Sequence, residues 1–168
     1  TIAPNFICAS GGTITDSGDY RIHTFTASGN LVVCAAPTPG NNVVSYMIVA
    51  GGGAGGKGHG GGGGAGGFRE YKSPTDSYTA SPLDGNPGGS NSVFACITST
   101  GGGKAANWTN AGATGGSGGG GGGPNAPTTS GYAGNTPPTS PPQGNSGGNG
   151  TNPGAGGGGG GATVSGSN

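Results

Sequence analysis

Short runs of alternating apolar and polar residues occupy the first 50 positions of the chain. Residues 20–26, 31–34 and 43–50 each predict a β-strand, and Ser28-Gly29-Asn30 predicts a tight turn between the first two. Residues 91–100 predict another short strand, which we expect to complete the same sheet. The predicted fold class is therefore all-β, with a small antiparallel, sandwich-like sheet in the N-terminal part.

The run at residues 43–50 differs from the other two because both of its faces are apolar. Val44, Tyr46 and Ile48 point to one side, while the apolar residues 43, 47 and 49 point to the other. A strand that is covered on both faces has this kind of continuous apolar sequence. These residues are therefore where we expect a hydrophobic core to form.

Beyond residue 50 glycine replaces this alternation. The chain has 47 glycines among its 168 residues, and no segment keeps a helical periodicity. Glycine in a helix costs about 1 kcal/mol relative to alanine, so we expect little or no α-helix. We divide the chain into a β-sheet region, a glycine run followed by a mixed segment, and an uncharged segment rich in Gly, Pro and Asn: residues 1–50, 51–104 and 105–168.

The uncharged segment allows two interpretations. Its low complexity is typical of a flexible tail. Alternatively, glycine runs such as residues 118–123 and 156–161 adopt the polyglycine II conformation, an extended left-handed helix with three residues per turn and no internal hydrogen bonds. Such helices can pack side by side and satisfy one another's backbone groups. The second interpretation predicts a bundle in which backbone hydrogen bonds replace a hydrophobic core.

Charged residues are few and scattered, with 5 basic and 5 acidic side chains and a formal net charge of zero. Nucleic-acid binding normally requires a basic patch, and a membrane span needs about 20 apolar residues. We therefore expect no nucleic-acid partner and no membrane insertion. The chain begins at Thr1 rather than at a methionine, so we expect a processed form or a fragment of a longer protein.

The sequence SYMIVAGGGAGGKGHGG, residues 45–61, has the outline of a strand that enters a phosphate-binding loop. Such a loop needs Ser or Thr after its lysine and a helix that follows, but Lys57 is followed by Gly58, His59 and more glycine. We therefore expect no nucleotide cofactor. This stretch instead predicts a crossing from a side-chain core to a backbone-bonded scaffold, with Lys57 and His59 directed outward.

No group of residues in the sequence predicts catalysis or metal binding. His23 lies in a predicted strand, and His59 lies among glycines. The carboxylates form no recognisable pair, and no serine has a nucleophile-elbow context; the acidic residues are Asp16, Asp19, Glu70, Asp76 and Asp84. We therefore predict a non-enzymatic protein with no metal and no cofactor.

Three cysteines, Cys8, Cys34 and Cys96, are widely spaced and fit no metal-binding or redox motif. The simplest arrangement is one disulfide, whose pairing the sequence leaves open, and one remaining thiol that can pair with a neighbouring chain. The alternative is that all three are small buried hydrophobic residues.

Two aromatic residues of the uncharged segment, Trp108 and Tyr132, are candidates for surface recognition. Each lies beside polar loops, a composition suited to contact with carbohydrate or protein. The alternative is that each ring packs over glycine segments as a local cap.

Five stretches together resemble a glycine-rich domain of predicted tail-fibre and minor tail proteins from bacteriophages, including many marine ones. They are GGTITDSGDYRIHTFTASGNLVV, VSYMIVAGGGAGG, GGGGAGGFRE, GNTPPTSPPQGNSGGNG and GGGGGGA. The resemblance covers nearly the whole chain, although residues 71–110 match less closely. It also extends to the receptor-binding tips of some long tail fibres, which look like layered bundles of polyglycine helices.

This resemblance implies an extracellular structural or adhesion protein on the virion tail. It implies a homo-oligomer that contacts other virion or fibre proteins and binds host-surface carbohydrate or protein. The glycine runs would form the scaffold, and the loops between them, at residues 105–110, 125–135 and 137–145, would contact the host.

Two other functions fit the same composition. A subunit of a bacterial extracellular filament would use an N-terminal segment such as TIAPNFICAS to pair with the sheet of the next subunit. An ice-binding protein is the third hypothesis, because polyglycine-type bundles also resemble certain antifreeze proteins. The irregular glycine spacing argues against the flat repeating face that ice binding would use.

Overall fold

A computed structural model describes residues 7–36, 44–71, 88–123, 125, 126, 128–151 and 154–168. Two compact units, Thr1–Val44 and Ser45–Asn168, divide the chain, and each is described by itself. We expected the N-terminal region to extend to residue 50, but the division falls before Ser45, so the third predicted strand belongs to the glycine-rich unit. The described residues contain no helix and only antiparallel strands, which confirms the all-β class.

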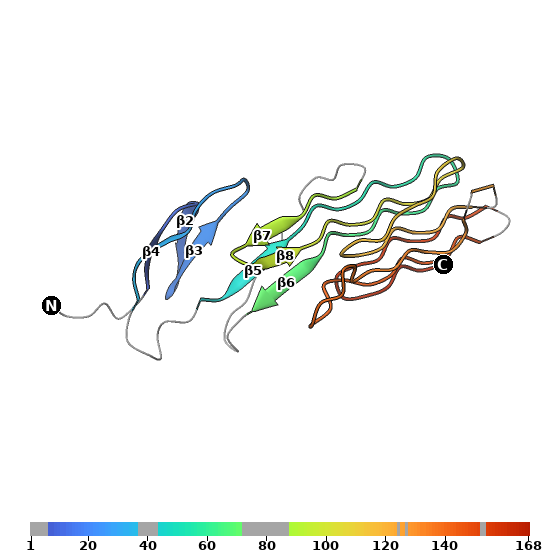
Figure 1. The fold of residues 1–168 in the computed structure, drawn as a ribbon. Helices are drawn as coiled ribbons and strands as arrows, with labels where there is room; N and C mark the ends of the chain where they lie inside the picture. Colours follow the sequence, from blue (N-terminus) through green and yellow to red (C-terminus); the bar gives the residue numbers. More distant parts are fainter. Residues whose placement is uncertain (1–6, 37–43, 72–87, 124, 127, 152–153) are drawn as a thin grey trace. The chain divides into compact units, whose positions relative to one another are not determined.

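The first unit consists of two antiparallel two-stranded ribbons (Figure 1). Strand β1 (Cys8–Ser10) pairs with β4 (Val32–Ala35), and β2 (Thr13–Ser17) pairs with β3 (Tyr20–Thr24). Gly18 and Asp19 form the turn between β2 and β3, where Gly18 has a φ of 57° that favours glycine.

The predicted hairpin between residues 20–26 and 31–34 is wrong. Strand β3 pairs instead with β2, in unbroken register from Thr13 opposite Thr24 to Ser17 opposite Tyr20. The half-buried Phe25 ring then lies where side chains at Gly12 and Gly29 would project, within 3.1 Å and 3.0 Å of their ideal Cβ positions. The chain after β3 therefore passes around this ring instead of making a tight turn at residues 28–30.

The second unit contains the other strands, in two further hairpins. Strand β5 (Tyr46–Val49) pairs with β6 (Phe68–Tyr71), and β7 (Ser92–Phe94) pairs with β8 (Ile97–Ser99). The described strands thus form four two-stranded sheets rather than the single sandwich-like sheet that we expected.

The expected strand at residues 91–100 is a hairpin of its own and does not complete an N-terminal sheet. It reverses at Ala95, which has a positive φ of 52°, and Cys96. The hairpin packs beside β5 and β6, where the Tyr46 ring lies 5.9 Å from Phe94 and 6.2 Å from Tyr71 between ring centroids. Aromatic packing therefore joins these two sheets.

The β5–β6 pairing continues directly into glycine. The ladder ends with Val49 opposite Phe68. The segment that follows β5 then stays paired with the segment that precedes β6, and every third N–H of the first donates to a carbonyl of the second. The three bonds are Ala50 to Gly67 at 3.0 Å, Gly53 to Gly64 at 2.8 Å and Gly56 to Gly61 at 2.9 Å. A period of three is that of polyglycine II. The expected crossing from strand to backbone-bonded scaffold is confirmed.

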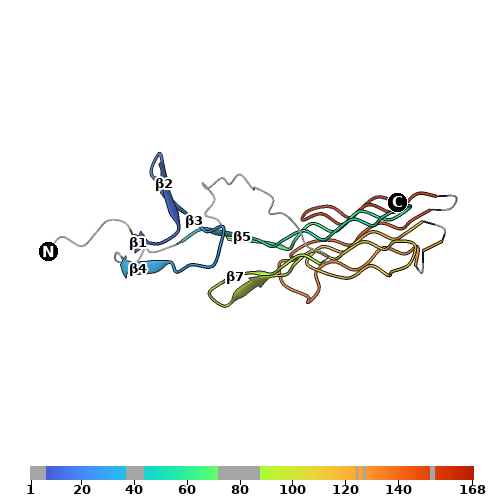
Figure 2. The ribbon, with the colours of Figure 1, turned by 90° about the horizontal axis from the view of Figure 1, so that it is seen from above.

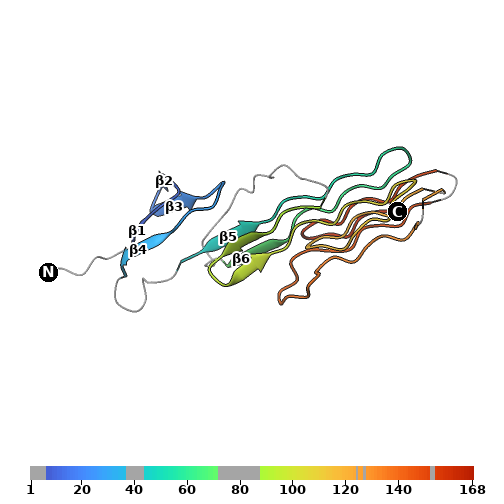
Figure 3. The ribbon, with the colours of Figure 1, turned by 45° about the horizontal axis from the view of Figure 1, so that its top comes forward.

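The buried run at residues 115–123 has neighbours in several directions. Successive N–H groups donate to carbonyls of different segments. The fourth N–H then donates to the same segment as the first. These bonds are Gly118 to Asn145 at 3.0 Å, Gly119 to Ala113 at 3.2 Å, Gly120 to Gly62 at 2.8 Å and Gly121 to Gly148 at 3.0 Å. In all three views the glycine segments run side by side along the unit (Figures 1, 2 and 3). The polyglycine bundle, rather than the flexible tail, is confirmed.

The spacing of this bundle depends on the absence of side chains. An ideal Cβ on Gly118 would lie 1.8 Å from the Tyr132 carbonyl oxygen, which is well inside van der Waals contact. At Gly55, which faces outward, the nearest atom to such a Cβ is 3.7 Å away. Inward positions therefore require glycine, and outward positions do not.

Few side chains form a core. Among the described residues, the buried apolar side chains are Ile48, Ala50, Ala105 and Ala106. Of the expected core at residues 43–50, Ile48 and Ala50 are buried and Val44 is exposed, while residue 43 lies outside the described ranges. The fully buried Gln143 has a different role: its Oε1 accepts from Thr100 N at 2.8 Å, and its Nε2 donates to Pro137 O at 2.9 Å. Hydrogen bonding by this side chain holds together segments at the strand-bearing end of the bundle.

Candidate functional site

Several chain reversals of the second unit meet at the end of the bundle that lies away from its strands. The Gly123 N–H donates to the His59 carbonyl at 2.7 Å, and His59 Nδ1 donates to the Gly154 carbonyl at 2.9 Å. Gly58 in turn lies against the indole of Trp108. We call this surface, formed by Lys57, Gly58, His59 and residues 107–110, the tip.

Trp108 is the most prominent side chain of the tip. Half of its surface, 50%, is exposed, although its ring stacks on His59 with centroids 5.5 Å apart and planes 14° apart. Gly58 has a positive φ of 69°, and an ideal Cβ there would come within 3.3 Å of Trp108 Cε2. His59 and Gly58 thus support the indole while leaving part of it open to solvent.

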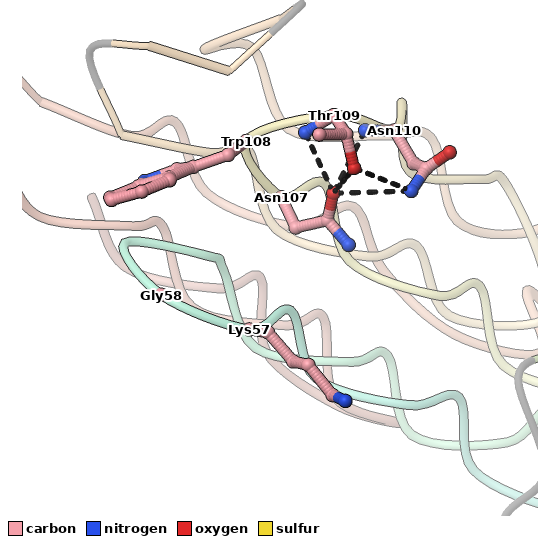
Figure 4. A pocket seen from close by; sticks show the side chains of 6 residues that line it. All are labelled: Lys57, Gly58, Asn107, Trp108, Thr109 and Asn110. Carbon is pink, nitrogen blue, oxygen red and sulfur yellow. Dashed lines mark hydrogen bonds between the residues drawn. The ribbon is translucent and has the colours of Figure 1, made fainter.

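Asn107 shapes the turn that carries Trp108. Its Oδ1 accepts hydrogen bonds from the backbone N–H groups of Thr109 at 3.0 Å and Asn110 at 2.8 Å (Figure 4). Its own N–H donates to the Asn110 carbonyl at 2.9 Å. Asparagine stabilises turns by this kind of side-chain bonding. The turn is therefore closed on itself, and Trp108 extends outward from it.

An open hollow of about 430 Å³ lies between the two turns, lined by Lys57, Gly58, Asn107, Trp108, Thr109 and Asn110 (Figure 4). A second hollow of about 330 Å³ shares Lys57, Asn107 and Asn110 with the first and adds Lys104. The combined surface has an aromatic ring, amide groups and two ammonium groups. It suits reversible binding of a polar ligand and has no nucleophile–base pair among its lining residues.

Tyr132, the other predicted recognition residue, lies elsewhere. It is half-buried, and its hydroxyl shares a hydrogen bond with the Thr128 hydroxyl. Its ring fills the position that a side chain on Gly112 would take, 2.5 Å from the ideal Cβ. Tyr132 therefore has the arrangement of the local cap that was the alternative interpretation, and it does not line either hollow.

The three predicted contact loops are placed differently from one another. Residues 105 and 106 are buried in the bundle, and only residues 107–110 reach the tip. Within residues 125–135, the N–H groups of Tyr132 and Asn135 each donate at 2.9 Å to a carbonyl of the buried run at residues 115–123. This part of the predicted loop therefore belongs to the bundle. Residues 137–145 include Gln143, whose backbone carbonyl accepts a hydrogen bond from Phe68 N. This loop therefore lies at the strand-bearing end of the bundle, away from the tip.

Two of the remaining candidates for chemistry have structural partners. His23 is half-buried and donates from Nδ1 to the Gly11 carbonyl at 2.7 Å. Asp16 pairs with Arg21 across the β2–β3 ribbon, with 2.9 Å between Oδ1 and Nε. No three His, Cys, Asp or Glu side chains gather into a metal site within the ranges described, and Asp76 and Asp84 lie outside those ranges.

All three cysteines are exposed free thiols in the structure, so the alternative of buried hydrophobic residues is wrong and the predicted disulfide is not formed. Cys8 lies opposite Ala35, and the register then shifts so that Ala9 lies opposite Val33, which leaves Cys34 as the extra residue of a β-bulge. A hydrogen bond to Cys34 raises the pKa of the Cys8 thiol. Cys96 lies in the β7–β8 turn of the other unit. Within the first unit, the structure therefore brings together Cys8 and Cys34.

Sequence reasoning predicted Trp108 but not its partners. Lys57 and His59 are exposed, as expected, yet they act together with a turn about fifty residues later in the chain. The sequence did contain a signal for these partners of Trp108. KGH at residues 57–59 and NWTN at residues 107–110 both interrupt glycine- and alanine-rich runs with polar residues. Two consecutive polar interruptions of this kind are typical of a turn at the end of a bundle segment, which limits the pairs that can meet.

Within the described ranges, no helix has the length and apolar character required to cross a membrane. Comparisons with protein-family models, curated proteins and solved structures found no match to this chain.

Proposed function

We propose that this chain is a non-enzymatic attachment protein of a bacteriophage tail, in which the bundle holds the tip for contact with the host surface. The observation that carries the proposal is the exposed Trp108 on a backbone-bonded scaffold. A ring that is half exposed yet stacked on His59 is held in place before it meets a ligand. Such pre-organisation reduces the entropy lost on binding.

The scaffold supports this role because its rigidity does not depend on the tip residues. Inward positions of the bundle are occupied by backbone, so the turns at its end are free to differ in sequence without disturbing the packing. Binding residues are commonly found on loops that a rigid framework positions. Tip residues would then determine the ligand, and glycine runs would determine the shape.

The first unit supplies the assembly function in this proposal. Its ribbons have two strands each, and Ile14, Ile22, Val32 and Val33 are between 46% and 52% exposed. Isolated two-stranded ribbons are marginally stable in water. We propose that a second copy of the chain covers these side chains, so that a homo-oligomer presents several tips along with other fibre proteins.

Immunogold electron microscopy with antibody raised against the full chain tests the location. Labelling at the tail ends of phage particles is the expected result. Labelling along filaments that carry no phage particle would contradict it and favour the second candidate, an extracellular filament subunit. The observation that favours this candidate is that every strand of the two-stranded ribbons is an edge strand, available for pairing with another subunit.

Competition for phage adsorption tests the attachment role directly. Added wild-type protein should slow adsorption of the phage to its host, and Trp108→Ala should compete about fivefold less well, because stacking on an aromatic ring contributes about 1 kcal/mol. Val164→Ala is the matched control, since Val164 is 68% exposed but lines neither hollow. Equal competition by both variants would refute a binding role for the tip.

A further inference from the structure

The two hollows of the tip form one continuous surface with distinct ends. They share Lys57, Asn107 and Asn110, while Trp108 lines only the larger and Lys104 only the smaller. Volumes of about 430 Å³ and 330 Å³ are each within the range of a small-molecule site. A ligand that spans both must present a flat apolar face at one end and anionic groups at the other.

The aromatic end suits a pyranose ring. Such a ring offers C–H groups on its face and hydroxyls around its edge. The hollow beside the exposed indole is also lined by Asn107, Thr109 and Asn110, of which the Thr109 hydroxyl and the Asn110 amide N–H already bond within the turn. In Figure 4 the amide nitrogen of Asn107 is turned away from the hydrogen bonds of its own turn, toward the chain that carries Lys57. It can therefore donate to a hydroxyl at the ring edge.

The charge of the surface is of one sign. Lys57 and Lys104 are the charged residues that line the hollows, and no carboxylate lines either of them. Cations without an acidic partner favour an anionic ligand, and the attraction weakens as salt rises. The chain as a whole has no net charge, so this local excess of positive charge is a property of the tip.

An extended acidic peptide fits the tip less well. Peptides that bind by strand addition need unpaired backbone groups. In the turn at residues 107–110, the N–H groups of Asn107, Thr109 and Asn110 are already bonded within the turn. The groups offered to a ligand are side chains around an aromatic ring, which is an arrangement for a sugar.

We propose that the tip binds an acidic glycan, with one pyranose against Trp108 and an anionic group of the same or the next sugar near Lys57 and Lys104. This inference rests on the attachment function proposed above and names its ligand class. His59 is a positioning residue in this proposal, because it supports the indole from within the tip.

The single tryptophan of the chain makes the test specific to this site. Intrinsic fluorescence of the full-length protein is followed while tetragalacturonate, its methyl ester or a sulfated galactan tetrasaccharide is added. We expect the two anionic sugars to bind and the uncharged methyl ester to bind at least about tenfold more weakly, with the difference lost at high salt. The two anionic arms distinguish a carboxylate from a sulfate ligand.

Variants separate the two ends of the surface. The double variant Lys57→Gln, Lys104→Gln should remove the preference for the anionic sugars but keep weak binding of the ester, whereas Arg21→Gln, a cation lost from the first unit, should change nothing. Trp108→Ala removes the fluorescent reporter, so its binding is measured by calorimetry and should fall about fivefold for every sugar. Trp108→Phe should recover part of that loss.

Failure of this inference differs from failure of the proposed function. Equal binding of the methyl ester, or equal binding of a polyglutamate peptide, would overturn the acidic-glycan ligand. So would the absence of sugar binding while phage adsorption still depends on Trp108, a result that leaves attachment intact. If neither the sugars nor phage adsorption depend on Trp108, both proposals are wrong.

Discussion

The strand ribbons of the first unit and the glycine bundle of the second use the same backbone hydrogen bond in different geometries. In the β2–β3 ribbon each strand bonds to one partner on one side, and its side chains remain largely exposed. In the bundle, consecutive residues of the run 115–123 bond to different neighbours, so the run is enclosed without any large side chain. Burial of backbone, rather than burial of apolar side chains, is what distinguishes the second unit.

This difference indicates where each unit is vulnerable. Most buried backbone N–H and C=O groups in proteins are hydrogen-bonded. In the bundle the segments that form these hydrogen bonds also pack so closely that they keep water out. The second unit should therefore be sensitive to any atom added between its segments. The first unit should respond instead to cross-links and to charge pairs, which act on its two-stranded ribbons.

The largest expected effect is from an added methyl group in the bundle. Gly118→Ala would place Cβ 1.8 Å from the Tyr132 carbonyl oxygen, so segments must separate, and we expect a loss of about 3 kcal/mol in the free energy of unfolding of the second unit. Thermal unfolding and amide hydrogen exchange of the glycines measure it.

Gly55→Ala is the matched control for this substitution. The nearest atom to its Cβ is 3.7 Å away, so the variant should be neutral or more stable by about 0.5 kcal/mol, because alanine has less conformational freedom in the unfolded chain. Equal destabilisation by both variants would mean that steric exclusion does not set the packing of the bundle.

A cross-link should strengthen the first unit alone. Exposure to oxidised glutathione transfers two electrons and two protons from the Cys8 and Cys34 thiols to the glutathione disulfide and joins the two sulfurs. Closing a loop of this length stabilises by about 3.5 kcal/mol at most, and strain at the bulge lowers that figure. Slower amide exchange in β1–β4, with no change in the bundle, is the expected outcome.

Peptide mapping identifies the cross-link. Trypsin should release Thr1–Arg21 joined to Ile22–Lys57, and the Cys96→Ser variant should behave in the same way, since Cys96 belongs to the other unit. A cross-link that includes Cys96, or none at all, would contradict the arrangement of the β1–β4 ribbon.

The smallest expected effect is that of pH on the Asp16–Arg21 pair. Hydrogen bonds from Arg21 hold the pKa of the Asp16 carboxyl below its usual range. The ionised carboxylate therefore stabilises the first unit at pH values above the usual carboxyl pKa, and this contribution is lost as pH falls through the lowered pKa. Both side chains are more than half exposed, so the change is small.

Carboxyl NMR titration measures this shift. Arg21→Gln should return the pKa of Asp16 toward its usual range and leave amide exchange in the bundle unchanged. An unchanged titration of Asp16 in that variant would show that the ion pair has no influence in solution.

The sequence predicted the architecture better than the connections within it. Runs such as residues 118–123 can satisfy their backbone groups by packing together, so composition predicted the bundle as one of two interpretations, the other being a flexible tail. The partner of β3 was predicted wrongly, although Gly18-Asp19 supplies a two-residue turn to β2, because strand alternation alone does not decide between a turn at Gly18 and one at Gly29. A pairing chosen among several candidates leaves no periodic pattern.

The tip shows the same limit. Trp108 was recognisable as a lone aromatic residue, but Tyr132 had equal standing in sequence, and only the three-dimensional arrangement separates a ring stacked on His59 from one that covers Gly112. The sequence shows that Lys57 and Lys104 are charged, but it does not predict that the two side chains line the same hollow. Their proximity follows from the register of the bundle, which no single segment encodes.

The threefold repeat that carries the β5–β6 pairing into Gly53 and Gly56 limits how such a chain can change in length. Removing one residue from a glycine run turns all that follows by about 120°, so that outward positions such as Gly55 become inward ones. Insertions and deletions within the runs are therefore tolerated in steps of three, whereas the turns at the tip accept any number. Related chains should differ in length accordingly.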